Sequence, residues 1–328
     1  MIKKNTKRIT GVGSALVDLL ALEEDTFLQL LGSAKGGMTL VESEFIERAI
    51  ERASRKPAIV SGGSACNTVA GVGMLGGDAR FIGVMGQDTF GELFHFDLKK
   101  SNVEAVLSLS ASPTGKVLSV ITPDAQRTMF TCLGASTELN PAAMNRHLFE
   151  GCAIVVVEGY LLFNPALMLA TVRAAKEAGA LVSLDLASFD VVNQSRDLLE
   201  TLVADYVDIL IANEDEAHAY TGHTDALKAL AGLSRNVTIA ALKVGALGSY
   251  LSHAGEVIRI EPQTDCPAID TTGAGDLWAA GFLYGLVNGY SLDRCGALGS
   301  ACGYEVCQVI GAKIPDHGWK RIRSLIHC

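Results

Sequence analysis

The stretch that decides the fold is DTTGAGDLWAAGF, residues 270–282. Two threonines lead into Gly273, Ala274 and Gly275, and Asp276 follows at the start of an apolar segment that predicts a helix. Small residues at a helix start let successive backbone N–H groups approach an anion, and the helix dipole adds to that attraction. The stretch therefore predicts a phosphate or oxyanion site at the amino end of a buried helix.

Asp276 has two interpretations. A carboxylate in the first helical turn interacts favourably with the helix dipole, which is a purely structural role. A carboxylate beside an anion site is also where a general base for a hydroxyl would lie, while the amides hold the charge that develops on a transferred phosphoryl group. The motif alone supports the two interpretations equally.

Away from this stretch, short aliphatic runs alternate with segments of helix length. CAIVVV (152–157), PALMLATVRAAKEAG (165–179), ALVSLD (180–185) and VDILIA (207–212) are examples. This alternation is typical of βαβ units, so we expect an α/β fold with a central, mostly parallel sheet flanked by helices, and the rhythm holds from about residue 59 onward.

Two segments leave this rhythm. Residues 15–45 contain no clear βα unit, and residues 105–133 contain TGKVLSVITPDAQRTMFTCLG, which predicts a hairpin with its turn at Pro123 and Asp124. No linker or low-complexity tract divides the chain. We therefore expect a single domain over residues 1–328, with a small β lid built from these two segments.

Ligands of open α/β sheets bind at the carboxyl ends of the strands. Unusual loops are expected there: GSALVD after the first strand, SGGSACN after AIV, NEDE after DILIA, and the opening motif after CPAI. In SGGSACN, Gly62 and Gly63 would let a ligand touch the backbone, and Asn67 offers a donor and an acceptor to a sugar hydroxyl. A glycine-rich turn with a polar cap explains this loop equally simply.

Two further loops are candidates for nucleotide and metal binding. In NEDE, Asn213 and Glu216 share one face of a helix start and could hold a hydrated Mg²⁺, although an acidic first turn needs no metal. In KVGALG, Gly245 and Gly248 form a turn where backbone could approach a nucleotide phosphate, with Lys243 supplying charge. An ordinary β-turn is the alternative.

Composition excludes several classes of function. The net charge is −9 and no basic run is present, so a nucleic-acid or anionic membrane surface is not expected. No segment approaches about 18 consecutive apolar residues, and the eight cysteines show no C-x-x-C pair, so we expect a cytoplasmic protein without structural disulfides or zinc. A complete dinucleotide fingerprint is missing, which argues against an NAD-linked oxidoreductase. A Walker A loop and a G-x-S-x-G elbow are missing as well.

Taken together and in this order, SGGSACN, NEDE, KVGALG and DTTGAGD resemble the ribokinase/PfkB family of small-molecule kinases along essentially the whole chain. The resemblance implies a ribokinase-like fold and ATP-dependent phosphorylation of an alcohol. By resemblance, Asp276 is the base, and Gly273, Ala274 and Gly275 form the anion hole. Substrate contacts are implied at Asp18, Gly62, Gly63 and Asn67, and Glu216 would hold Mg²⁺ through water. ATP and phosphate contacts are implied at Asn213, Lys243, Gly245, Gly248, Thr272 and, as a lid closes, Arg127.

The resemblance carries further expectations. Asp270 matches a K⁺ ligand of the family, and CQVIGA (307–312) resembles the loop that supplies carbonyl oxygens. GSALVDLLALEEDTFL and EGYLLFNP are more similar to the adenosine-kinase branch than to ribokinases, whereas Lys243 stands where ribokinases commonly carry threonine. Tyr160 would stack on a base, unless it is simply a core aromatic.

The expected substrate is therefore a small molecule, a nucleoside with a primary hydroxyl. A free sugar, as for ribokinase or fructokinase, is the first alternative. A catalytically silent nucleoside- or sugar-binding module is the second, because fold alone does not fix function. The exposed edge of the lid sheet would be able to pair with a second copy and form a homodimer.

Overall fold

The computed structural model describes residues 6–263 and 265–326. Its centre is a nine-stranded sheet in the order β14-β13-β12-β11-β10-β9-β1-β5-β6. The strands from β12 to β6 pair in parallel, and β13 and β14 extend the sheet antiparallel. The bounds are β1 Arg8–Val12, β5 Ala79–Gly86, β6 Val103–Ser110, β9 Cys152–Glu158, β10 Leu181–Asp185, β11 Ile209–Ala212, β12 Ile239–Lys243, β13 Ser249–His253 and β14 Glu256–Ile260.

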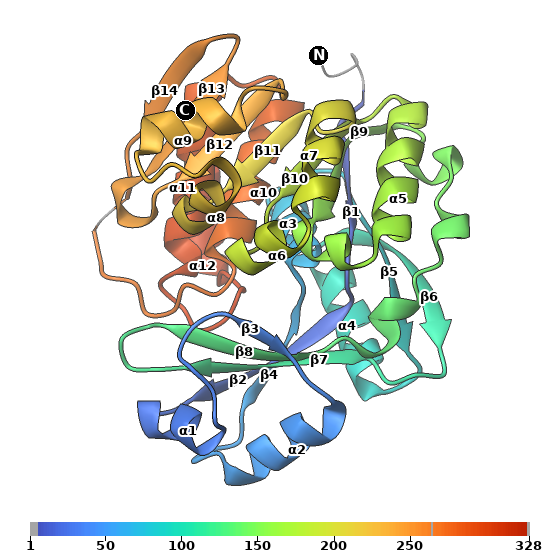
Figure 1. Ribbon diagram of the computed structural model, residues 1–328, viewed down its shortest axis with the longest axis vertical. Helices are drawn as coiled ribbons and strands as arrows, with labels where there is room; N and C mark the ends of the chain where they lie inside the picture. The colour runs from blue at the N-terminus through green and yellow to red at the C-terminus, as the bar shows by residue number, and fades with distance from the viewer. Residues whose placement is uncertain (1–5, 264, 327–328) are drawn as a thin grey trace.

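Helices cover both faces of this sheet (Figure 1), which confirms the expected layered α/β architecture. The interior strands are continuous apolar runs because neither face meets water. One face packs against α3 Ser64–Met74, α4 Thr89–Lys100, α10 Ala274–Val287, α11 Leu292–Val306 and α12 Asp316–Ile326. The other packs against α5 Pro165–Ala178, α6 Phe189–Gln194, α7 Arg196–Asp205, α8 Glu214–Thr221 and α9 Ala226–Leu233. None of the helices within the described ranges has the length and apolarity to cross a membrane.

A five-stranded sheet in the order β3-β8-β7-β2-β4 lies beneath the nine-stranded sheet in Figure 1. Its strands are β2 Leu16–Leu22, β3 Met38–Leu40, β4 Ala58–Gly62, β7 Gly115–Ile121 and β8 Arg127–Cys132, with α1 Asp25–Leu30 and α2 Ser43–Arg52 on its outer face. Strands β7 and β8 pair antiparallel across the predicted turn, so the hairpin is confirmed. That this sheet moves as a lid stays a prediction.

Two expectations about strands are wrong. AIV lies in β4, which pairs antiparallel with β2 in the smaller sheet, so SGGSACN connects the smaller sheet to α3 and does not follow a core strand. CPAI forms no strand, since residues 265–273 contain none. A short apolar run does not reveal which sheet it joins, and Pro267 removes a ladder donor from the second run. Strand β6, within the range expected for the lid, belongs to the nine-stranded sheet.

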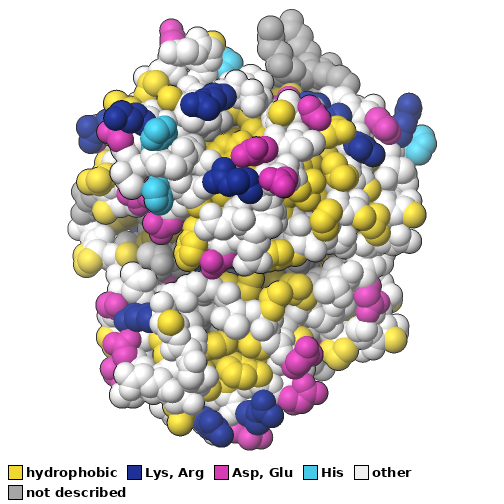
Figure 2. All heavy atoms as spheres, viewed as in Figure 1, with side chains coloured by type: hydrophobic (Ala, Val, Ile, Leu, Met, Phe, Trp, Pro, Cys, Tyr) yellow, Lys and Arg dark blue, Asp and Glu magenta, His cyan; other side chains and the backbone are white. Residues whose placement is uncertain are grey.

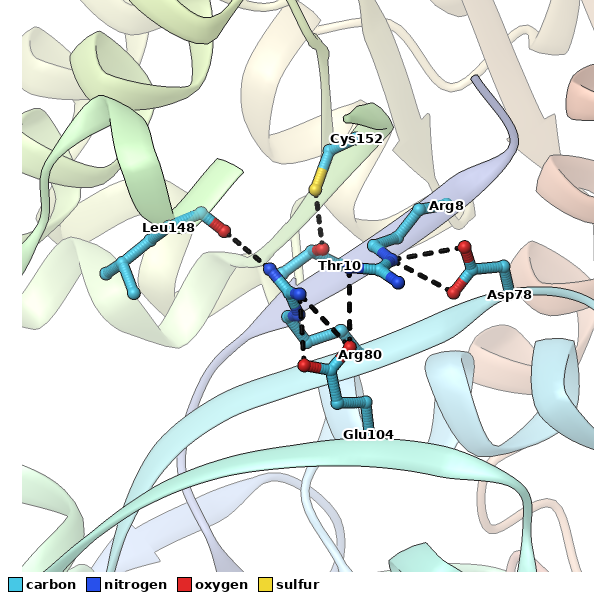
Figure 3. Close-up of polar contacts among 7 residues, drawn as sticks. All are labelled: Arg8, Thr10, Asp78, Arg80, Glu104, Leu148 and Cys152. Atoms are coloured by element: carbon cyan, nitrogen blue, oxygen red, sulfur yellow. Dashed lines mark hydrogen bonds and ion pairs between the residues drawn. The ribbon is translucent and has the colours of Figure 1, made fainter. Parts of the chain in front are cut away.

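A polar network ties together the amino ends of four core strands, at the opposite end from the loops of interest (Figure 3). Arg8 of β1 pairs with Asp78 at 2.9 Å and with Glu104 of β6 at 3.4 Å, and Arg80 of β5 pairs with Glu104 at 3.0 Å. The Cys152 thiol of β9 lies 2.8 Å from the Thr10 hydroxyl. Asp78 and Glu104 are about half exposed, so these ion pairs contribute little to the free energy of unfolding. Their main effect is to hold the strand ends in register.

Candidate active site

A cavity of ≈ 1450 Å³ lies between the two sheets, at the carboxyl ends of the core strands. The space-filling view shows the molecule hollowed between its upper body and the smaller layer below (Figure 2). The sequence-predicted residues on its wall are Asp18, Gly63, Asn67, Arg127, Tyr160, Asn213, Glu216, Lys243, Gly245, Gly248, Thr272, Gly273, Ala274, Gly275 and Asp276. Gly62 and Asp270 lie behind this wall, in supporting positions.

Asp276 lies in the first turn of α10 and is held by a second helix. The Ser64 hydroxyl donates to its Oδ1 at 2.7 Å, and the Asn67 amide donates to its Oδ2 at 2.9 Å. Burial raises the pKa of the Asp276 carboxyl, the two hydrogen bonds oppose this rise, and the charge of Asp185 adds to it. The result is a fixed carboxylate that is more basic than an exposed one, as a general base requires.

Gly273 sets the conformation of the loop before α10. It is the N-cap residue, with φ +74°, in the left-handed region that favours glycine. A Cβ at this position would also lie 2.5 Å from the Cβ of Ala312. The loop therefore lies directly against residues 307–312, and Gly273, Ala274 and Gly275 line the cavity. The Ala274 N–H donates to the Thr271 carbonyl at 3.1 Å. The N–H groups that follow at the start of α10 could bind an anion.

Asp270 supports this loop from behind. It is fully buried; its Oδ1 accepts the Thr272 N–H at 2.9 Å and the Thr272 hydroxyl at 2.7 Å, and its Oδ2 accepts the Gly311 N–H at 2.8 Å. The carboxylate therefore joins the loop before α10 to residues 307–312. The family resemblance also placed Asp270 beside residues 307–312, but as ligands of K⁺. In the structure, hydrogen bonds from the Asp270 carboxylate connect the two segments.

Lys243, at the end of β12, brings positive charge to the start of α10. A Cβ on Gly275 would lie 2.9 Å from the Lys243 ammonium, so the ammonium lies directly beside the first helical turn. The ammonium pairs with Asp185 at 2.9 Å. Burial lowers the pKa of Lys243, but the charges of Asp185 and Glu216 outweigh this effect and raise it, so the side chain remains a cation.

Asn213 and Glu216 form a complete capping box at the start of α8. Glu216 accepts the Asn213 N–H at 2.8 Å and its side-chain amide at 2.7 Å, while its own N–H donates to Asn213 at 2.9 Å. Burial, followed by the charge of Asp185, raises the pKa of Glu216 to about 7. Each Glu216 oxygen accepts one hydrogen bond, and both residues line the cavity. Their oxygen atoms suit a Mg²⁺ ion that retains its own water, as this ion usually does.

Asp18 lines the cavity from strand β2 of the smaller sheet. The expected loop position is therefore wrong, because the chain enters β2 at Leu16 directly after a short connection. Gly62 makes room for this side chain, since a Cβ there would lie 2.4 Å from the Asp18 carboxylate. Burial raises the pKa of Asp18 to about 6, with the charge of Arg127 opposing the rise.

The cavity wall also contains residues that the sequence motifs did not indicate, among them Ser64, Glu158 and Asp185. The two acids share a signal, because each is the last residue of a buried core strand, where a charged side chain is rare unless it has a partner. Ser64 offered no such signal, since a serine at a helix start is ordinarily a cap.

The cavity's acids predict that stability falls as pH rises. The pKa values of Asp18, Glu158 and Glu216 are raised to about 6, 7 and 7, so between about pH 4 and 7 these three groups bind more protons in the folded protein than in the unfolded chain. The stability that these three acids contribute is fully present below the pKa values that they have in the unfolded chain. It is lost as the pH rises through the pKa values that they have in the folded protein. We expect the melting temperature to be higher near pH 5.5 than at pH 8.

Asp18→Asn tests the cause of that slope. The variant should flatten the decline between pH 4 and 6 and raise the unfolding free energy at pH 8, where a shift of two pKa units corresponds to roughly 3 kcal/mol. Asp124→Asn is the control: Asp124 is exposed, and hydrogen bonds from Lys35 and Thr122 lower its pKa, so its effect lies below about pH 4. If stability depended on pH in the same way in Asp18→Asn as in the wild type, solvent would reach the Asp18 carboxyl group and its pKa would not be raised.

Residues 26–317 match the pfkB family of carbohydrate kinases, and the chain belongs to this family. It is therefore a phosphotransferase with an alcohol group as acceptor, of a family whose kinases use ATP, normally with Mg²⁺. This confirms the class and the fold implied by the sequence motifs.

Similar proteins include both sugar kinases and nucleoside kinases. A ribokinase of Arabidopsis thaliana is 28% identical over 309 residues, covering 88% of this chain and 78% of the relative, and an adenosine kinase of Saccharomyces cerevisiae is 27% identical over 279 residues, covering 79% and 81%. Among solved structures, an adenosine kinase from Sinorhizobium meliloti has a TM-score of 0.91 at 32% identity, covering 97% of this chain and 99% of its own. A probable sugar kinase from Rhizobium etli has a TM-score of 0.92 at 31% identity, covering 98% of each chain.

Proposed function

We propose that this protein transfers the γ-phosphoryl group of ATP to the primary hydroxyl of a nucleoside such as adenosine, with Asp276 as the general base. The observation that carries the proposal is the position of Asp276. Its carboxylate is fixed by Ser64 and Asn67 at the point where the amides of α10 begin, inside a cavity that reaches both sheets. A binding module would have no use for a base held in this way.

The proposed chemistry requires positioning and charge more than covalent participation by the protein. Asp276 takes the proton of the acceptor hydroxyl. The N–H groups at the start of α10 and the Lys243 ammonium hold the negative charge of the transferred group. Mg²⁺, when bound, offsets phosphate charge, and Asn213 and Glu216 would hold it through water.

ATP would lie on the side of the cavity formed by the turn between β12 and β13. Gly245 and Gly248 both have positive φ there, and Thr272 lines the same cavity. Arg127, on β8 of the smaller sheet, lines the cavity from the opposite side. Closure of that sheet would bring Arg127 toward phosphate and exclude water in the same movement.

The lining of the acceptor end favours a nucleoside over a free sugar. Beside the polar pair of Asp18 and Asn67, the wall is largely apolar; its members include Met38, Leu40, Leu133, Leu139, Tyr160 and Phe163. A pentose would leave this apolar surface without a partner, whereas a nucleobase could pack against it and stack on Tyr160. Adenosine kinases among the similar structures agree with this choice.

Two alternatives follow from specific observations. A sugar kinase is supported by the ribokinase and probable sugar kinase relatives, and by the hydroxyl-binding chemistry of Asp18 and Asn67. A silent binding module is the less supported alternative, because Asp276 and the loop before α10 are both intact.

The acceptor class is tested by comparing kcat/KM for adenosine, ribose, fructose and 5′-deoxyadenosine with Mg-ATP. We expect adenosine to be the best acceptor and 5′-deoxyadenosine to be inert, because it lacks the reacting hydroxyl and keeps the base. Preference for ribose or fructose would overturn the nucleoside assignment and favour the sugar-kinase alternative.

We further propose that K⁺ increases the rate, through Asp270 and the carbonyl oxygens of residues 307–312. These groups form an oxygen-only set beside the loop before α10, although the Cys307 carbonyl already accepts the Ile269 N–H at 2.7 Å. The rate in KCl should exceed the rate in tetramethylammonium chloride at equal ionic strength. Equal rates in the two salts would remove K⁺ from the mechanism.

We also propose a cytoplasmic location and homodimerisation through the smaller sheet. Ile59 on the edge strand β4 is exposed, which suits pairing between copies. The cysteines within the described residues are all free thiols, as is usual in a reducing compartment. Sedimentation of the purified protein at micromolar concentration tests the dimer, and a purely monomeric species would exclude it.

A further inference from the structure

Glu158 is a buried carboxylate that the proposed chemistry leaves without a role. It is the last residue of β9, and its side chain is 2% exposed. Its Oε1 accepts the Ser14 N–H at 2.8 Å and its Oε2 accepts the Ala65 N–H at 3.2 Å. One carboxylate thus holds two backbone amides that lie far apart in the sequence.

One amide belongs to a connection between the two sheets, and the other directly follows one. Ser14 lies between β1 of the nine-stranded sheet and β2 of the smaller sheet. Ala65 lies just after the connection from β4 of the smaller sheet back to α3. Glu158, which belongs to the nine-stranded sheet, therefore fixes one outgoing and one returning connection at the same point.

Close packing leaves these connections little freedom around Glu158. A Cβ on Gly13 would lie 2.4 Å from Glu158 Oε2 and 2.9 Å from the Ala65 Cβ. A Cβ on Gly63 would lie 2.4 Å from the Ser14 carbonyl oxygen. Two glycines thus allow the carboxylate and the two connections to meet at van der Waals distance.

Glu158 is also linked to Asp276 through α3. The Ala65 amide is in the first turn of α3, and Ser64 and Asn67 of the same turn donate the hydrogen bonds that hold Asp276. A shift of this turn by a few tenths of an ångström would move both donors away from the carboxylate. A displacement of Ala65 would therefore reach the two side chains that hold Asp276.

We propose that Glu158 is a positioning residue, which locks the connections between the two sheets and, through α3, holds Asp276 in its reactive position. Its effect on the rate rests on the proposed role of Asp276, whereas its effect on the two connections does not. Without the Glu158 carboxyl group, the Ser14 and Ala65 amides would lose their shared acceptor, and a buried N–H group left without an acceptor is costly.

The test is hydrogen–deuterium exchange of the ligand-free protein, combined with steady-state kinetics. In Glu158→Gln, which keeps the side-chain shape, we expect exchange at Ser14 and Ala65 to be faster by about tenfold or more. We expect kcat to fall by about tenfold or more, with the KM for ATP unchanged. Gly13→Ala, whose Cβ would press on the same carboxylate, should produce the same exchange pattern.

Glu305→Gln is the matched control, because Glu305 is also a buried glutamate but pairs with Arg321 of α12. It should leave exchange in both connections and kcat unchanged.

Unchanged exchange at Ser14 and Ala65 in Glu158→Gln would overturn the proposal, whatever the kinetics. Faster exchange with an unchanged kcat, or a rise confined to the acceptor KM, would overturn the link to Asp276. If no acceptor reacts with the wild type, the proposed function fails, while the exchange comparison still decides whether Glu158 locks the connections.

Discussion

Asp276→Asn is expected to lower kcat by about 10³-fold while the protein stays folded, because a positioned general base contributes on this scale. Asparagine has nearly the same shape as aspartate and can still accept one of the two hydrogen bonds from Ser64 and Asn67. It cannot take a proton from the acceptor hydroxyl. The KM for ATP should change little, since Asp276 acts on the acceptor. Steady-state kinetics with saturating ATP and adenosine measures the effect.

Asn67→Asp is an informative companion to this variant. It removes one donor from Asp276 and places a second carboxylate beside it, at the 2.9 Å separation of the present hydrogen bond. Two carboxylates this close share a proton, so the pH at which activity begins to rise should move upward.

A fully active Asp276→Asn enzyme would mean that another group, or the phosphate itself, accepts the proton.

Gly273→Ala is expected to cost about 10²-fold or more in kcat, as loss of an anion-site donor typically does. The alanine would keep a positive φ at a cost of roughly 1–2 kcal/mol. Its Cβ would also meet the Cβ of Ala312 at 2.5 Å, so the loop or residues 307–312 must shift. Either shift moves the N–H groups that begin α10 away from the transferred phosphoryl group.

Gly289→Ala separates these two effects. Gly289 has the same φ of +74°, but no atom lies within 4 Å of the Cβ that would be added there. This control should lose only the stability that a positive φ costs alanine, as measured by thermal unfolding, and keep its activity. If Gly273→Ala were as active as Gly289→Ala, the amides before and at the start of α10 would have no part in transfer.

Much of the fold was predictable because its signals are local. Alternating aliphatic runs and helical segments identified the mostly parallel sheet, and the Pro123 and Asp124 turn identified the β7–β8 hairpin. The partner of strand β4 was not predictable, because a short apolar run fits either sheet. Its assignment to the smaller sheet depends on pairing with β2 more than thirty-five residues earlier in the chain, which periodicity does not encode.

The cavity wall was predictable where one short motif carries several groups, as in residues 270–276 and 213–216. It was not predictable where the residues act in pairs across the fold. Asp185 matters because it meets Lys243, and Glu158 because it meets Ser14 and Ala65. Each pair joins residues from different elements, and a single sequence contains no direct record of such contacts.

Product analysis tests the central claim most directly. The purified protein is incubated with Mg-ATP and adenosine, and ADP and AMP are quantified by chromatography, with Asp276→Asn treated in parallel. Because γ-phosphoryl transfer to the 5′-hydroxyl converts ATP to ADP and adenosine to AMP together, we predict equal amounts of the two products and almost none with the variant. ADP without AMP, or no product from the wild type, would contradict the assignment of this protein as an adenosine-type nucleoside kinase.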